Sequence, residues 1–357
     1  MALIQTTILI FTFFSFFIGQ IFRLNIFNIS FPLIDIAIIL LSLTNLYQHF
    51  RQKNLKPNNK YFLYFLSFAW IFLFINLAKY QIYSLKPLFY LVRLTCLLSL
   101  IIFPLEIKNK LNKVFLIFII SNVVFGLIQY FFWPDFTYFD INNWDPHLYR
   151  LISTYFDPTF TAVIYLFLII KLFLNKDIAY RQPLLLLTYV AMALTYSRST
   201  YLSFLVAFAF IAINQKKIKI FVFSFLIILL TIIILPRQPG EGTRLERTSS
   251  IFAKIENYQE GLKLFTQSPI IGHGYNNLSF IRNSKSNSHA ISGFDGSLLT
   301  ILVTTGIIGF SFFVLGINTF FHQSNLLKKT MLISLLVHSL FANSFLYPWI
   351  LLSFLLF

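Results

Sequence analysis

Long apolar runs separated by short polar stretches dominate the hydrophobic pattern of this chain. A run of about 20 apolar residues matches a bilayer hydrocarbon core of about 30 Å. Several runs are shorter, which is typical of tilted, kinked or paired half-helices. We therefore expect an all-α, polytopic membrane helical bundle with about twelve membrane segments, some of them short. The expected segments are residues 3–22, 31–48, 61–78, 86–105, 114–133, 159–174, 183–196, 200–213, 218–235, 297–321, 330–341 and 344–357.

The composition favours a membrane protein and excludes a soluble domain. Hydrophobic residues make up 57% of the chain and charged residues only 11%, whereas soluble domains carry about a quarter charged residues. The first apolar run lacks a preceding basic region and a following small-residue cleavage site, so we expect an uncleaved span. The one cysteine, Cys96, lies inside an apolar run, which leaves no intrachain disulfide.

The basic residues predict the orientation. The net charge is +16, and fifteen of the 28 Lys and Arg residues fall in alternate short loops, at residues 51–60, 106–113, 171–182, 214–219 and 322–330. Lysine and arginine are enriched in the cytoplasmic loops of membrane proteins. We therefore expect the protein in the cytoplasmic membrane, with these loops and both termini on the cytoplasmic side. This placement accounts for the positive charge without a nucleic-acid partner.

The remaining connections should then lie on the outer face. They are residues 134–158, the turn around Tyr196 to Ser199, and a loop over residues 236–296. A loop of about 60 residues among short connections is usually functional. The chain thus divides into membrane helices (1–133), helices with outer-face motifs (134–235), the long outer loop (236–296) and carboxy-terminal membrane helices (297–357).

An amphipathic helix is expected inside the long loop. Apolar residues recur there at helical spacing, at Ile251, Ile255, Tyr258, Leu262 and Phe265. Residues 248–250 offer N-cap side chains, and the Ser-Pro pair at 268–269 should end the helix. Its apolar face would rest on the outer leaflet or on the bundle; alternatively, the helix only packs the loop down.

Candidate chemistry also gathers on the outer face. The chain has no phosphate-binding loop ending in Gly-Lys-Ser/Thr, no His-Glu-x-x-His and no Asp-x-Asp, so we expect no metal and no nucleotide cofactor. Arg198 ends a span, and Arg244, Arg247 and Lys254 lie near the start of the amphipathic helix, where cations favour phosphate. Alternatively, Arg198 only extends its charged end to the lipid headgroups, and the residues near the amphipathic helix only form a solvated basic surface.

His289 follows as a candidate base. It lies a few residues before the apolar run that starts near Leu298, and a neutral imidazole could remove a proton there at neutral pH. The alternative is a hydrogen-bonded structural histidine.

Four stretches in this order resemble the O-antigen ligase and polymerase superfamily, membrane proteins that act on lipid-linked glycans outside the cytoplasmic membrane. The resemblance covers about residues 145–312, and the amino-terminal third matches only as a series of spans. The stretches are Arg150 to Thr159 (Arg-Leu-Ile-Ser-Thr-Tyr-Phe-Asp-Pro-Thr), Thr195 to Arg198 (Thr-Tyr-Ser-Arg), Lys254 to Tyr258 continuing to Pro269-Ile-Ile-Gly-His-Gly and Asn277, and His289 to the Gly-x-x-Gly that ends at Gly309.

The resemblance implies a metal-independent, inverting glycosyltransferase without a cofactor. Its donor would be an oligosaccharide on a polyprenyl-pyrophosphate carrier, and its acceptor a sugar hydroxyl. Arg198, Arg244, Arg247 and Lys254 would bind the pyrophosphate, His289 would take the acceptor proton, and Arg150 and Asp157 would organise the site or bind sugar. Lys254 stands where the family has an arginine, so the charge is kept but bidentate geometry is lost.

The acceptor stays open at this stage. A polymerase would use a second lipid-linked repeat, a ligase the lipid A core, and a protein-directed relative a protein hydroxyl. The Tyr-Asn-Asn at 275–277 and the Asp-Gly-Ser-Leu-Leu at 295–299 resemble polysaccharide polymerases more than ligases. Membrane lipids and a chain-length regulator would be further partners. A flippase or exporter, or a structural envelope subunit, would instead tolerate the change His289→Ala.

Overall fold

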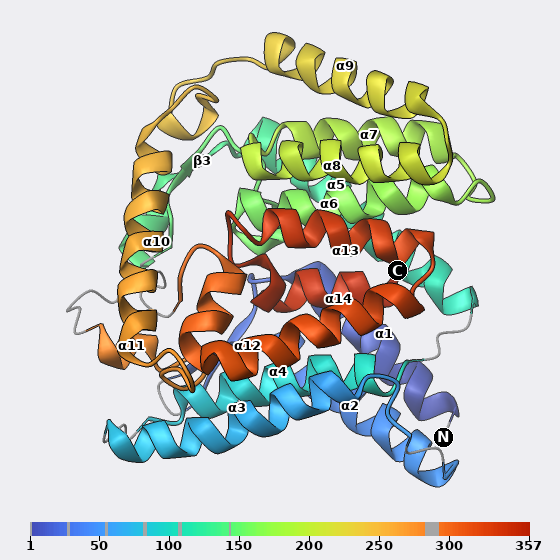
Figure 1. The fold of residues 1–357 in the computed structure, drawn as a ribbon. Coiled ribbons are helices and arrows are strands. Elements are labelled where there is room, and N and C mark those ends of the chain that lie inside the picture. The colour runs from blue at the N-terminus through green and yellow to red at the C-terminus, as the bar shows by residue number, and fades with distance from the viewer. Residues whose placement is uncertain are drawn as a thin grey trace.

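The structure is a computed structural model that describes residues 2–26, 29–53, 56–80, 84–105, 109–142, 144–282 and 293–357. Helices form most of it (Figure 1). The apolar helices are α1 (Ala2–Ile18), α2 (Leu33–Arg51), α3 (Lys60–Lys79), α4 (Lys86–Ile102), α5 (Asn109–Phe132), α6 (Pro158–Leu174), α7 (Arg181–Ala193), α8 (Arg198–Asn214), α9 (Ile218–Ile234), α12 (Ser297–Gln323), α13 (Leu326–His338) and α14 (Pro348–Leu356).

The prediction of an all-α, multi-pass membrane bundle is confirmed. Each of the twelve predicted ranges holds one of these helices. Helices α2, α3, α5 and α12 are long and apolar enough to cross a membrane, and α1, α6, α8 and α9 are shorter apolar helices. Helices α7, α13 and α14 have 13, 13 and 9 residues, too short for a straight crossing of about 30 Å. The number of crossings therefore stays a prediction.

The remaining elements are small. Helix α10 (Ser249–Gln267) is followed by α11 (Leu278–Ile281), and two antiparallel hairpins pair β1 (Arg23–Ile26) with β2 (Ile29–Pro32) and β3 (Asp135–Phe136) with β4 (His147–Leu148). Single 3-10 turns are η1 (Thr137–Asn142), η2 (Ser153–Tyr155), η3 (Glu241–Thr243) and η5 (Ser344–Leu346).

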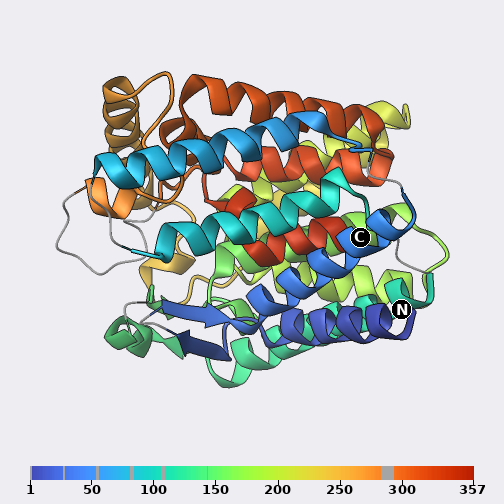
Figure 2. The same ribbon diagram turned by 90° about the horizontal axis from the view of Figure 1, so that it is seen from below.

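The chain connections divide between two ends of the bundle. Figures 1 and 2 show both termini and the α6–α7 connection at one end, and α10, α11 and the two hairpins at the other. We call the second the motif end, because residues 144–158, 195–199 and 236–282 gather there. The predicted sharing of one end by these stretches is thus confirmed. That this end faces away from the cytoplasm stays a prediction.

Helix α6 forms the centre of the bundle, and α9 lies at its edge. Residues 161–170 of α6 are all buried, as expected for a helix that is apolar on every side. In α9, Phe223 and Ile233 are 65% and 72% exposed. Apolar side chains that point away from the protein can only face lipid in a membrane, so α9 borders the bilayer on its outer side.

Helix α12 is broken at Gly306, and the break accepts a loop. Gly306 has φ of 62° and ψ of −172°, a conformation that essentially only glycine adopts. The segment 269–274 docks there: Ile307 N donates to Pro269 O at 2.8 Å, and Gly274 N donates to Thr304 O at 2.8 Å. The Pro-x-x-Gly-x-Gly and Gly-x-x-Gly stretches therefore form one structural unit, which fixes the end of α10 to α12.

Candidate functional site

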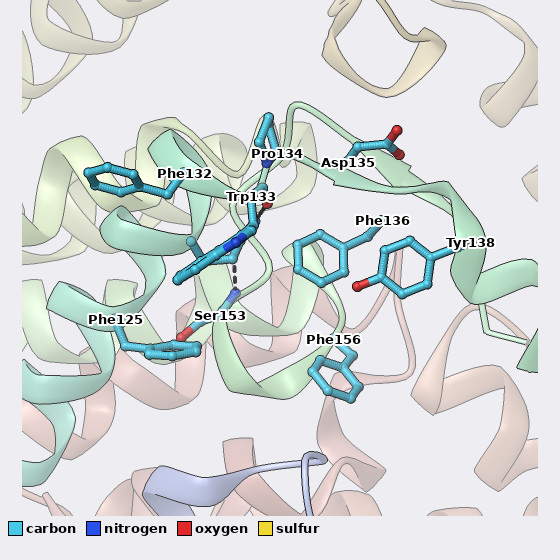
Figure 3. A pocket seen from close by; sticks show the side chains of 10 residues that line it. Phe125, Phe132, Trp133, Pro134, Asp135, Phe136, Tyr138, Ser153 and Phe156 are labelled. Carbon is cyan, nitrogen blue, oxygen red and sulfur yellow. Dashed lines mark hydrogen bonds between the residues drawn. The ribbon is translucent and has the colours of Figure 1, made fainter.

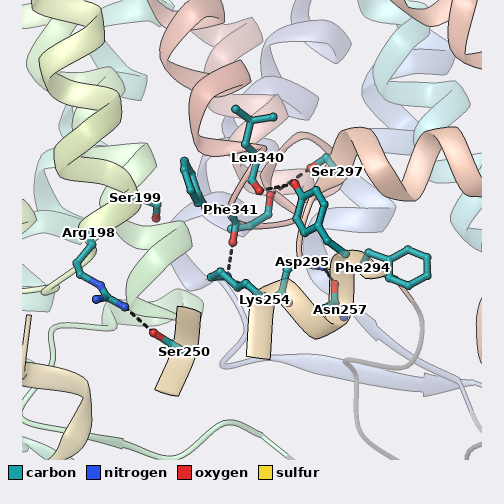
Figure 4. A network of polar contacts seen from close by, with 12 residues as sticks. Arg198, Ser199, Ser250, Lys254, Asn257, Phe294, Asp295, Ser297, Leu340 and Phe341 are labelled. Carbon is teal, nitrogen blue, oxygen red and sulfur yellow. Dashed lines mark hydrogen bonds and ion pairs between the residues drawn. The ribbon is translucent and has the colours of Figure 1, made fainter. Parts of the chain in front are cut away.

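A cluster of arginines lies where α8 begins at the motif end. Tyr196 has a positive φ of 53°, which lets the chain turn sharply from α7 into α8 and sets Arg198 at the first position of the helix. Arg198 Nη1 donates to Leu245 O at 3.1 Å and Arg247 O at 2.7 Å, and its Nη2 donates to Ser250 Oγ at 2.5 Å (Figure 4). Arg198 thus holds the start of α10 against α8.

Arg150 lies buried beside this turn. Its Nε donates to Thr195 O at 2.9 Å, and its chain passes so close to Gly242 that a Cβ there would lie 2.7 Å from Arg150 Cδ. Burial, followed by the charge of Arg247, lowers the pKa of Arg150 to about 10. The guanidinium therefore stays charged at neutral pH, and its Nη atoms make no hydrogen bond to any described residue.

Arg247 completes the cluster. Its Nη1 donates to Gly242 O at 2.6 Å and Arg244 O at 3.1 Å. Burial and the charge of Arg198 lower its pKa, whereas Glu241 raises it. In the part of the chain that the structure describes, none of Arg150, Arg198 and Arg247 has a carboxylate within 4 Å. Three partly buried cations without an anion favour the binding of one.

Lys254 is engaged differently from the pyrophosphate role predicted for it. Its Nζ lies 3.1 Å from Asp295 Oδ2 and donates to Phe341 O. Tyr258, one turn further along α10, donates to Leu340 O at 2.5 Å. Lys254 and Tyr258 therefore fasten α10 to the segments that precede α12 and follow α13.

The other predicted site residues lie outside the arginine cluster or outside the described part of the chain. The Arg244 side chain is exposed and makes no hydrogen bond or ion pair with the described residues. Asp157 is the N-cap of α6, and its Oδ1 accepts from Thr159 N at 2.6 Å and Phe160 N at 2.9 Å. Burial raises the pKa of Asp157, against these hydrogen bonds and the charge of Arg150. His289 lies outside the described residues.

The predicted amphipathic helix is confirmed as α10, but its apolar and polar side chains are not cleanly separated on two faces. It spans Ser249–Gln267 and ends before Ser268-Pro269, and its N-cap Thr248 makes no side-chain capping bond. Tyr258 and Phe265 of the predicted stripe pack against a small apolar cluster that contains Phe294, Leu299 and Val303. Ile251, Ile255 and Leu262 are about half exposed. The surface that meets the bundle also carries Ser250 and Lys254.

Two cavities adjoin the site. One, of about 440 Å³, lies between α8, α9 and the loop before α10; Arg198, Tyr196 and Arg237 line its polar part, and Leu202, Leu205, Ile228 and Ile232 its apolar part. The other, of about 460 Å³, lies at the end of α5 and is lined mainly by aromatic rings, among them Trp133 and Tyr138 (Figure 3).

The buried histidines His338 and His147 lie beside the predicted site residues but were not among them. His338 lies between Ser199, at 3.0 Å from Nε2 to Oγ, and Ser344, at 2.5 Å from Nδ1 to Oγ. His147 lies near Arg150, and burial, with a smaller effect of that charge, lowers its pKa to about 3. The short spacing between His147 and Arg150 was the available signal for the second; His338, inside an apolar run, offered none.

Comparison with known families agrees with the resemblance. Residues 183–314 match the family model of the O-antigen ligase, a range that runs from α7 to α12 and includes Arg198, Arg247, Lys254 and the break at Gly306. A comparison with curated proteins gave no match. Residues 183–314 are thus similar to the O-antigen ligase family, and this match supports the predicted relationship to the O-antigen ligase and polymerase superfamily, membrane enzymes of surface polysaccharide assembly.

Proposed function

We propose that the protein transfers a glycan from a polyprenyl-pyrophosphate carrier to a hydroxyl group of an acceptor sugar. The observation that carries this proposal is the cluster of Arg150, Arg198 and Arg247, which come from three segments and have no carboxylate partner among the described residues. The reaction would be inverting, and it would need no metal.

The cluster suits the chemistry of the leaving group. Negative charge grows on the pyrophosphate as the bond to the sugar lengthens, and fixed donors that face this charge lower the barrier. Arg150 would contribute its free Nη atoms, while Arg198 and Arg247 would contribute the donors not used on backbone carbonyls. Arg244, which is exposed, would reach the same anion from solvent.

The cavity between α8 and α9 suits the carrier's lipid. Its apolar part would take the first isoprene units, and Arg198, at its polar part, would meet the pyrophosphate. Because α9 is exposed along its outer side, the groove is accessible from the bilayer by movement of one peripheral helix. A lipid substrate could enter sideways without leaving the membrane.

The motif end would face the periplasm or cell exterior. The basic loops gather at the opposite end, in agreement with the preference of lysine and arginine for the cytoplasm. The exposed Ile251, Ile255 and Leu262 of α10 would then lie in the outer headgroup region.

For the acceptor we propose a second lipid-linked repeat, which makes the protein a polysaccharide polymerase. The residues at 275–277 and 295–299 support this choice through their resemblance to polymerases. The name of the matching family supports the alternative, a ligase that uses the lipid A core or a protein hydroxyl.

The glycan profile of a strain that lacks the protein separates these functions. Single repeats capped onto the core would identify the missing step as polymerisation. Long chains that accumulate on the carrier would identify it as ligation. An unchanged profile would refute both.

Complementation then tests the cluster. Wild type should restore the profile, and Arg198→Ala should not, although it inserts at normal abundance. Lys263→Ala is the matched control, because Lys263 is an exposed cation of α10 that lines neither cavity.

A further inference from the structure

We propose that Asp295 is the base that removes the proton from the acceptor hydroxyl, with Lys254 as its positioning residue. This inference rests on the proposed function, because it names the proton acceptor of that transfer. It gives Asp295 the role that the sequence alone suggested for His289.

Asp295 is held in place from two sides. It lies two residues before α12, its Oδ2 is 3.1 Å from Lys254 Nζ, and its backbone N donates to Asn257 Oδ1 at 2.8 Å. Lys254 is itself fixed by Phe341 O (Figure 4). The carboxylate is thus oriented by α10, while 42% of its side chain remains exposed.

The free oxygen of Asp295 can receive a proton. Oδ1 has no hydrogen-bond partner among the described residues, so an acceptor hydroxyl can donate to it. Three other acidic groups near α10 are occupied: Glu260 pairs with Arg282, Glu246 pairs with Arg237, and Glu241 accepts from Ser249. Glu256 is exposed and lies two residues after Lys254 on α10, so it faces another side of the helix. Asp157 is buried as the cap of α6.

The spacing along α10 fits a direct displacement. Arg198 contacts Ser250, and Asp295 contacts Lys254. Ser250 and Lys254 are one turn apart on the same side of the helix, a rise of about 6 Å. Arg198 and Asp295 thus contact neighbouring turns of α10, which gives the leaving group and the attacking hydroxyl separate places. A sugar between the arginines and Asp295 would have its leaving group and its attacker on opposite sides.

The proposed step transfers one proton and breaks one bond as another forms. The acceptor hydroxyl gives its proton to Asp295 Oδ1, and its oxygen forms a bond to the anomeric carbon. The bond from that carbon to the pyrophosphate oxygen breaks, and the electron pair leaves with the pyrophosphate, next to Arg198. The configuration inverts, and Asp295 later releases the proton to water.

The test uses the full-length protein in lipid nanodiscs with a synthetic polyprenyl-pyrophosphate oligosaccharide. Asp295→Asn keeps the size of the side chain but removes its basicity, so the transfer rate should fall about 10²- to 10⁴-fold. Glu260→Gln breaks the other ion pair of α10 and is the matched control, with a rate close to wild type.

Azide distinguishes a base from a structural residue, because it attacks without losing a proton. Asp295→Ala should regain transfer when azide is added and form a glycosyl azide of inverted configuration. Lys254→Met should also lose transfer to hydroxyl but keep transfer to azide, and Lys254→Arg should restore the hydroxyl reaction.

Three results would overturn the inference. They are wild-type transfer by Asp295→Asn, no azide product from an inserted Asp295→Ala protein that still binds donor, and a loss that azide reverses in His289→Ala but not in Asp295→Ala. A wild-type protein that transfers nothing from this donor would refute the proposed function, and the inference with it.

Discussion

Replacing Gly306 by alanine should undock the 269–274 segment from α12. An alanine Cβ at this position would lie 2.3 Å from Ile270 O and 2.6 Å from Ile271 N, both backbone atoms. The backbone conformation alone, with φ of 62°, costs about 1–3 kcal/mol for a non-glycine residue. Relief of the overlap requires the segment to move away.

The size of the effect follows from the contacts that would be lost. Four backbone hydrogen bonds hold the segment: His273 N to Val303 O, Gly274 N to Thr304 O, Ile307 N to Pro269 O and Ile308 N to Ile270 O. They contribute about 1 kcal/mol each and about 4 kcal/mol together, which favours the docked state. The backbone cost of about 1–3 kcal/mol and the overlap with Ile270 O and Ile271 N favour opening. Because the backbone atoms cannot yield by this distance in the docked conformation, we expect the segment to open in most molecules, with a loss of about 4 kcal/mol in stability.

Hydrogen–deuterium exchange in detergent measures this opening. Peptides that contain residues 269–274 should exchange much faster in Gly306→Ala than in wild type, and the apparent Tm should fall. Gly316→Ala is the matched control in the same helix, because the atoms nearest to its new methyl group belong to the Phe62 side chain and not to residues 269–274. Equal exchange in the two variants, at the wild-type level, would refute this account of the α12 break.

Three further predictions concern the groove, the buried histidine and the helix cap. Leu202→Trp should fill the α8–α9 cavity and raise the KM for a long-chain polyprenyl donor but not for a two-isoprene donor; equal KM changes would count against the groove. The pKa of His147 is about 3 in the folded protein and about 6.5 in the unfolded chain. Between these two pH values only the unfolded chain binds a proton at this residue, so the folded protein loses stability as the pH falls below about 6.5. At pH 5 this loss is about 2 kcal/mol, and His147→Gln should remove it in thermal unfolding at pH 7 and pH 5; the same slope in both proteins would contradict the assignment. Asp157→Ala should cost about 1–2 kcal/mol through loss of the α6 cap, measured by thermal unfolding, whereas an unchanged Tm would show that the cap is unimportant.

The sequence predicted the elements of this fold well, because membrane spans are recognised by composition and length. Each apolar range holds a helix, and α10 was found from the spacing of Ile251, Tyr258 and Phe265. The position of the three motif stretches at one end of the bundle could also be predicted. Each span carries the chain to the opposite end, so every second loop lies at the same end.

Contacts between distant segments could not be predicted in the same way. Nothing local indicates that Lys254 pairs with Asp295 rather than meeting phosphate, since 41 residues separate them. The break at Gly306 likewise depends on a loop that arrives from residues 269–274. His338 resembles any polar residue at the end of a span, and only the packing of α8 against α13 brings Ser199 to it.

The rate of glycan transfer by purified protein in nanodiscs tests the central claim most directly. With a synthetic polyprenyl-pyrophosphate donor, wild type and Lys263→Ala should transfer at similar rates, because Lys263 is an exposed cation outside both cavities. Arg198→Ala, which removes a fixed cation from the leaving group, should be slower by about 10²- to 10³-fold. Equal rates for Arg198→Ala and wild type, with the variant inserted and folded, would contradict a pyrophosphate site at this cluster.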